Sequence, residues 1–103
     1  MEVKVGGLMN NDKEYANVPE GDTISYDQFV YYLEQGREIE FIYKDQLYFI
    51  DNAKKGRALW RGQTQLSDYS VGDGGTLLGS FKINRDSLGD LIKNKKLRIS
   101  TIF

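Results

Sequence analysis

The chain has 103 residues, of which 40% are apolar and 28% charged, and it contains one proline, no cysteine and no histidine. This length and apolar share suit one domain with a modest core, and the low proline content argues against a long disordered segment. The missing residue types exclude disulfides, thiolate zinc sites, Cys nucleophiles and imidazole bases. We therefore expect a non-enzymatic protein with no catalytic residue, no metal site and no cofactor.

Charge is distributed unevenly along the sequence. Residues 1–52 contain four Lys or Arg and eleven Asp or Glu, whereas residues 53–103 contain ten and four. In the fold, these halves either neutralise each other or separate into a dipolar surface. The sequence shows no signal peptide and no apolar run of about eighteen residues, so no membrane span is expected and the cytoplasm is the default location.

The first two segments in chain order differ in the strength of their signals. Residues 1–23 carry a brief alternation followed by turn residues, which predicts an edge strand or an irregular connection. Residues 24–36 predict a helix, because Ser25 is an N-cap type and Gly36 suits a left-handed stop. On this helix Tyr31 lies nearly opposite the apolar face, so we expect it at the surface.

Residues 37–62 change to a period of two, which predicts a β-hairpin followed by a third strand. A turn at Lys44 and Asp45 pairs Phe41 with Tyr48, although Lys-Asp is a poor two-residue turn and the register stays open. In this register one face carries the apolar residues Ile42, Leu47 and Phe49, and the third strand contains Trp60.

The C-terminal part is interpreted as a loop followed by regular structure. Residues 63–75 predict a loop, and residues 76–103 predict a strand, a helix and a strand. Gly74 and Gly79 have the P-loop spacing, but Ser80 stands where that motif requires lysine. The expected fold is a single α+β domain, with a mostly antiparallel sheet of about four to six short strands and two short helices.

Aromatic residues without an assigned core position indicate protein binding. Large, stiff side chains that combine apolar area with a polar contact are typical anchors of protein interfaces. The predicted partner-binding residues are Tyr31, Ile42, Leu47, Phe49 and Trp60. The alternative is that the second helix or the N-terminal segment covers this hairpin face and makes it part of the core.

Two other functions stay open at this point. A homo-oligomer holding a nucleotide-like small molecule would use Arg57, Trp60, Arg61, Gly72, Gly74 and Gly75. Binding of nucleic acid would use two basic groups, Lys54, Lys55, Arg57 and Arg61 around Trp60, and Lys93, Lys95, Lys96 and Arg98 near the end. The sequence pI near 5.4 is low for a nucleic-acid-binding protein.

The segment ISYDQFVYYLEQGREIEFIYKDQLYFI, residues 24–50, resembles one that recurs in small uncharacterised proteins of Gram-positive bacteria and their phages. There a short helix leads directly into a Glu-rich, aromatic hairpin. The resemblance covers about a quarter of the chain and carries no catalytic motif. The resemblance implies a small accessory protein, carried by a phage or another mobile element, that acts by occupying a host protein. We therefore expect an inhibitor or adaptor whose target is a host protein such as a defence protein.

Overall fold

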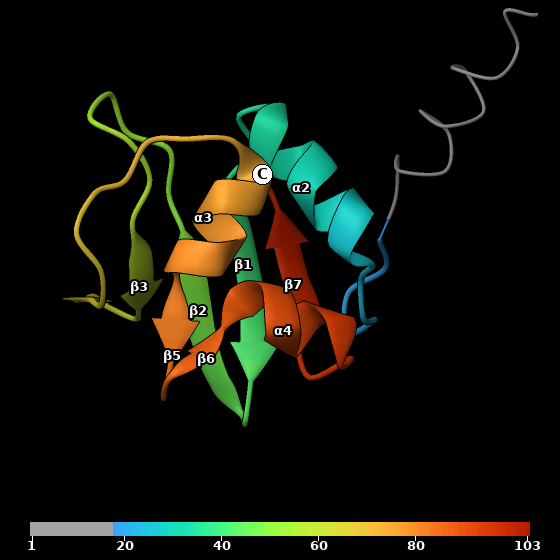
Figure 1. Ribbon diagram of the computed structural model, residues 1–103. Helices are drawn as coiled ribbons and strands as arrows, with labels where there is room; N and C mark the ends of the chain where they lie inside the picture. The colour runs from blue at the N-terminus through green and yellow to red at the C-terminus, as the bar shows by residue number, and fades with distance from the viewer. Residues whose placement is uncertain (1–17) are drawn as a thin grey trace, which may run out of the picture.

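A five-stranded antiparallel sheet and three helices form two layers in the computed structural model, which describes residues 18–103 (Figure 1). Across the sheet, the strands are β4 (Thr64–Gln65), β3 (Leu59–Arg61), β2 (Gln46–Ile50), β1 (Ile39–Tyr43) and β7 (Arg98–Ile102). The helices are α2 (Tyr26–Glu34), α3 (Gly74–Ser80) and α4 (Leu88–Lys93), and they lie together on one face of the sheet. A separate hairpin joins β5 (Lys82–Ile83) to β6 (Asp86–Ser87). The predicted α+β single domain is confirmed.

Helix α2 begins and ends where its capping residues predict. The Ser25 hydroxyl accepts a hydrogen bond from the main-chain N–H of Gln28 at 3.1 Å, and Gly36 has a φ of +79°. The expectation of an exposed Tyr31 is wrong, because this side chain is half-buried against the core and its hydroxyl accepts a hydrogen bond from Gln35. The helical periodicity places Tyr31 on the side of α2 away from the sheet, but neighbouring side chains still cover much of the tyrosine.

The register of the β1–β2 hairpin is the one that a Lys44-Asp45 turn gives. Ile39 pairs with Ile50 and Phe41 with Tyr48. Both turn residues are left-handed, with φ values of +50° and +64°. This is the backbone of a type I′ turn, whose twist matches that of the strands even though the sequence lacks Asn-Gly.

Residues 63–83 contain the main correction to the sequence-based expectations. The predicted loop begins with β4, and the predicted strand from residue 76 is helix α3 followed by the two-residue β5. Asp73 is the N-cap of α3, since its carboxylate accepts the main-chain N–H of Thr76 at 2.8 Å. Within this helix, Leu77 and Leu78 are both buried. Helix propensity does not predict this helix, because its sequence is rich in glycine and each glycine disfavours a helix by about 1 kcal/mol relative to alanine.

The core lies between the sheet and the helices. The ring of Phe41 stacks on Tyr48 with centroids 5.5 Å apart and meets Phe29 of α2 edge-on at 6.3 Å. All three side chains are at most 4% exposed, and burying one aromatic side chain contributes about 1.5–3 kcal/mol. The alternating residues of the predicted hairpin therefore supply the central layer of the core.

The connection before α2 reaches the outer edge of β7. Gly21 donates its N–H to the carbonyl of Ile99, and Ile99 donates in turn to Asp22. The irregular connection predicted here is confirmed for these residues. The edge strand predicted near residues 2–5 lies outside the described residues.

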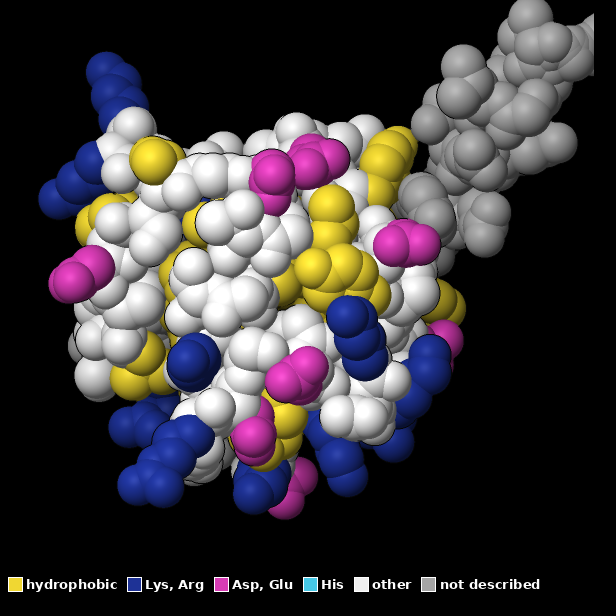
Figure 2. Space-filling model, in the orientation of Figure 1, with side chains coloured by type: hydrophobic (Ala, Val, Ile, Leu, Met, Phe, Trp, Pro, Cys, Tyr) yellow, Lys and Arg dark blue, Asp and Glu magenta, His cyan; other side chains and the backbone are white. Residues whose placement is uncertain are grey.

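Basic side chains are unevenly distributed on the face that Figure 2 shows. Lys and Arg side chains gather around the lower end of the molecule, with a few acidic side chains among them (Figure 2). Three turns meet at this end, those at residues 44–45, 84–85 and 94–97. We call it the basic end, defined by Lys44, Arg85, Lys95 and Lys96.

Candidate functional site

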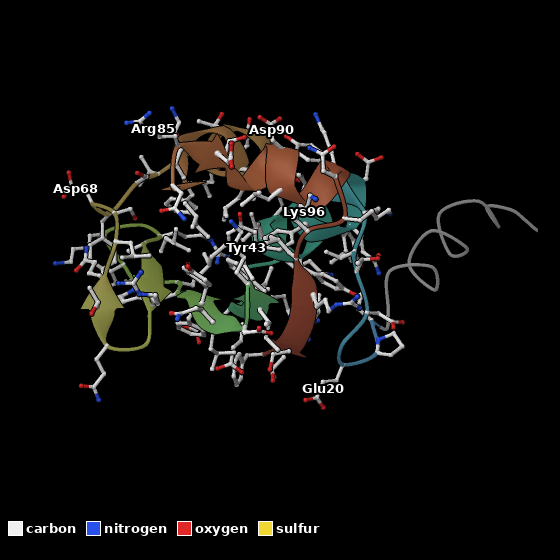
Figure 3. The ribbon with its side chains drawn as sticks, turned by 90° about the horizontal axis from the view of Figure 1, so that it is seen from below. Glu20, Tyr43, Asp68, Arg85, Asp90 and Lys96 are labelled. Carbon is white, nitrogen blue, oxygen red and sulfur yellow. The ribbon has the colours of Figure 1, made fainter. Side chains whose placement is uncertain are left out.

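The face of the sheet opposite the helices carries a group of large apolar side chains. Register places Trp60, Phe49 and Glu40 in one row across β3, β2 and β1, and Leu47 and Ile42 in the next. All three helices pack on the other side, as the view along the two layers shows (Figure 3). We call this surface the open face, defined by its apolar residues Ile42, Leu47, Phe49, Trp60 and Phe103.

These side chains are accessible to different degrees. Leu47 is 45% exposed and Phe103 is 58% exposed, whereas Ile42, Phe49 and Trp60 are half-buried by their neighbours. The rings of Phe49 and Phe103 meet edge to face with centroids 5.9 Å apart. Four of the five predicted partner-binding residues therefore lie together, and Tyr31 does not, because α2 lies in the other layer.

Phe103 belongs to the open face although strict alternation puts it with Leu97 and Ile99, which are buried in the core. Along β7, Ile99 pairs with Phe41 and Thr101 pairs with Glu40, so Ser100 is an extra residue in the ladder. Such a bulge reverses the faces of the residues that follow it. The sequence carries the apolar residue but no signal for the bulge.

The indole of Trp60 is held in a fixed orientation. Its Nε1–H donates to Oδ2 of Asp51 at 3.1 Å, and the Tyr69 hydroxyl donates to the same oxygen at 3.1 Å. Burial, with the hydrogen bond to Asp51 and the charge of that carboxylate, raises the pKa of Tyr69 above its ordinary value. Oδ1 of Asp51 accepts the N–H of Ala58 at 2.8 Å. A side chain fixed in this way loses little entropy on binding.

Acidic groups surround the apolar side chains. Glu40 follows the open-face alternation and accepts the Ser100 hydroxyl at 3.1 Å, and Glu38 accepts the N–H of Asn52 at 3.2 Å. With Asp51 they bring three carboxylates to this side of the sheet. The nearby cations are Arg98 opposite Ile42 and Arg37, which donates to the carbonyl of Phe103. The open face is therefore apolar, with charged groups of both signs at its border, three of them carboxylates.

Arg57 has a structural position that the sequence does not reveal. It is 6% exposed, and its guanidinium donates to the carbonyl oxygens of Leu33, Arg37 and Asp51 at 2.8, 2.9 and 3.1 Å. Burial lowers the pKa of Arg57 from its ordinary value, and the charges of Asp51 and Glu38 oppose this shift. The guanidinium is buried and bonded to main-chain carbonyls inside the fold, so it is not available to a ligand.

The predicted nucleotide-binding residues are not brought together. Gly74 and Gly75 form the first turn of α3 in the helix layer, while Trp60 belongs to the open face. The two predicted basic groups are also apart. Residues 54–55 follow β2 beyond Ile50, at the Ile39 end of the sheet, whereas residues 93–98 lie at the Tyr43 end.

The chain matches no known family or structure. Neither protein-family models, nor curated proteins, nor solved structures give a match. The resemblance of residues 24–50 to Gram-positive and phage proteins thus stays a prediction. Within residues 18–103, no group of three or more acidic side chains is arranged to hold a metal ion, and no helix is long and apolar enough to cross a membrane.

Proposed function

We propose that the protein is a binding module, an inhibitor or adaptor, that docks on another protein through the open face. The observation that supports this is the grouping of five large apolar side chains on the side of the sheet away from all three helices. Apolar groups of this kind in a water-exposed position are typical of protein interaction sites. Trp60 and Phe49 are the residue types that most often dominate binding energy.

Charge defines the chemistry of the partner. The carboxylates of Glu38, Glu40 and Asp51 favour a partner with exposed aliphatic or aromatic side chains next to Lys or Arg. A symmetric contact with a second copy would bring like charges together, because a two-fold interface places the same surface on both subunits. The favoured occupant is therefore a different protein with a basic, apolar surface.

The test is binding by variants that change only exposed atoms of the open face. Leu47→Asp and Phe103→Asp place a charge where an apolar contact is expected, and neither side chain is in the buried core. Purified chain and variants are each immobilised and incubated with nuclease-treated lysate, and the retained proteins are then purified for titration. We expect each variant to weaken binding of the specific partner by at least tenfold, since losing a central contact costs about 1–2 kcal/mol or more.

Val71→Asp is the matched control, because Val71 is 78% exposed in the connection between β4 and α3. It makes the same kind of change away from the open face and is expected to leave binding unchanged. The specific partner is taken as the protein that the parent chain retains in stoichiometric amount and whose binding weakens with salt. Equal binding by the parent chain, Leu47→Asp and Phe103→Asp would contradict the proposal.

A further inference from the structure

A groove at the basic end is separate from the open face. It consists of two depressions, of about 420 and 500 Å³, that share Tyr43 and Lys44. Both volumes are within the range of small-molecule sites. One is also lined by Asp86, Asp90, Leu91, Asn94 and Lys96, and the other by Gln46, Tyr48, Arg61 and Asn84. Figure 3 looks onto this end, with Tyr43 between the two layers and Asp90 and Lys96 around it.

The turns that build this end carry unusual residues. Among the described residues, five non-glycine residues have a positive φ, and all five are in these turns: Lys44, Asp45, Asn84, Arg85 and Lys95. The other left-handed positions are all glycines. A left-handed lysine or arginine is less favourable than glycine, and such conformations often accompany functional sites. Basic side chains therefore occupy positions that backbone conformation alone would assign to glycine.

The two depressions differ in the ligand groups that they suit. The Arg61 depression offers cations and amides and contains no carboxylate, which suits an anion. Its two tyrosines are only 6% and 4% exposed, so they leave little ring surface on which a base could stack. The Asp90 depression adds two carboxylates to Lys44 and Lys96, and carboxylates accept hydrogen bonds from hydroxyl groups.

We infer that the groove binds the phosphate monoester of a small hydroxyl-bearing molecule, a sugar phosphate or a nucleoside monophosphate. The phosphoryl group lies between Lys44 and Arg61, and the sugar hydroxyls face Asp86 and Asp90. An extended nucleic acid fits less well, because these carboxylates would repel its neighbouring phosphates. None of the open-face residues lines the groove, so ligand binding here can be tested independently of the proposed partner binding.

The test is calorimetric titration of the full chain with ribose 5-phosphate, inorganic phosphate and ribose. We expect ribose 5-phosphate to bind more tightly than phosphate, and ribose alone to bind least. Lys44→Gly removes the shared cation and suits the left-handed backbone, so its melting temperature should equal or exceed that of the parent chain. Its affinity for ribose 5-phosphate should fall about tenfold or more, as expected for a lost charge-assisted hydrogen bond.

Lys95→Gly is the matched control, since Lys95 is also left-handed and basic but does not line the groove. It should keep the parent affinity. Tighter binding of adenosine 5′-monophosphate than of ribose 5-phosphate would identify a nucleotide as the source, and equal binding a free sugar phosphate. Absence of saturable binding up to about 10 mM ribose 5-phosphate, or equal losses in both glycine variants, would overturn the inference.

Discussion

The guanidinium of Arg57 donates a hydrogen bond to the carbonyl oxygen of Leu33, near the C-terminal end of α2, at 2.8 Å. The last carbonyl groups of a helix lack their usual partner within the helix. The carbonyl of Leu33 also accepts the main-chain N–H of Gly36 at 3.0 Å, so the guanidinium is its second donor. Arg57 belongs to the segment just before β3, and it also bonds the carbonyls of Arg37 and Asp51. One buried side chain thus ties helix α2 to the sheet.

Replacing this side chain should lower the free energy of unfolding. Arg57→Met keeps much of the volume and removes one donor from each of three main-chain carbonyls, of which only that of Leu33 keeps a second donor among the described residues, the N–H of Gly36. We therefore expect a loss of about 2–4 kcal/mol in the free energy of unfolding. Urea denaturation followed by circular dichroism measures it. The control is Lys54→Met at an exposed position of the same connection, which should change stability little. A similar small effect for both variants would show that the Arg57 hydrogen bonds contribute little.

Gly74 marks the closest approach of α3 to α2. A Cβ atom at this position would lie 2.9 Å from Cγ1 and 3.2 Å from Cα of Val30, so Gly74→Ala must push the helices apart. We expect a loss of about 1–3 kcal/mol in the free energy of unfolding, the usual cost of overpacking. Gly79→Ala in the same helix meets nothing within 4 Å and should be neutral or stabilising, by up to about 1 kcal/mol. Thermal denaturation of both variants measures the difference, and equal melting temperatures would refute the packing argument.

Acid should weaken the start of α3. The N–H and hydroxyl of Thr76 bond the carboxylate of Asp73 and lower its pKa below 3.8, the ordinary value, with a smaller contribution from the N–H of Gly75. A carboxyl group with a lower pKa in the folded state contributes stability above its unfolded pKa and loses it as pH falls through the folded value. Asp73→Asn keeps an N-cap residue that does not titrate. Between about pH 6 and pH 3, the melting temperature of the parent chain should fall further than that of Asp73→Asn, and parallel curves would contradict this assignment.

Local signals were sufficient for the N-terminal half of the described fold. The N-cap at Ser25, the C-terminal Gly36 and the alternation through Phe41 each depend on residues close in sequence, so α2 and the β1–β2 hairpin could be predicted. The hairpin register stayed open, and the structure has the register that a Lys44-Asp45 turn gives. The grouping of Ile42, Leu47 and Phe49 on one face followed directly from that register.

The remaining features depend on contacts between distant residues. Helix α3 is glycine-rich and is stabilised by packing against α2, and propensity does not record such packing. Phe103 reaches the open face only because of a bulge at Ser100, and Arg57 is buried only because three carbonyls from other segments meet around it. The groove at the basic end is lined by turns from separate parts of the chain, so no local sequence motif predicts it.

The most direct test of partner binding uses Trp60, which is the only tryptophan in the chain and lies on the open face. Protein labelled with 5-fluorotryptophan gives one ¹⁹F NMR resonance from this position. Titration with the partner that the parent chain retains should shift or broaden this resonance in proportion to the complex formed, whereas the labelled Leu47→Asp variant should show no change at the same concentrations. A complex that co-elutes from a sizing column while the Trp60 resonance stays unchanged would place the partner elsewhere and contradict the account.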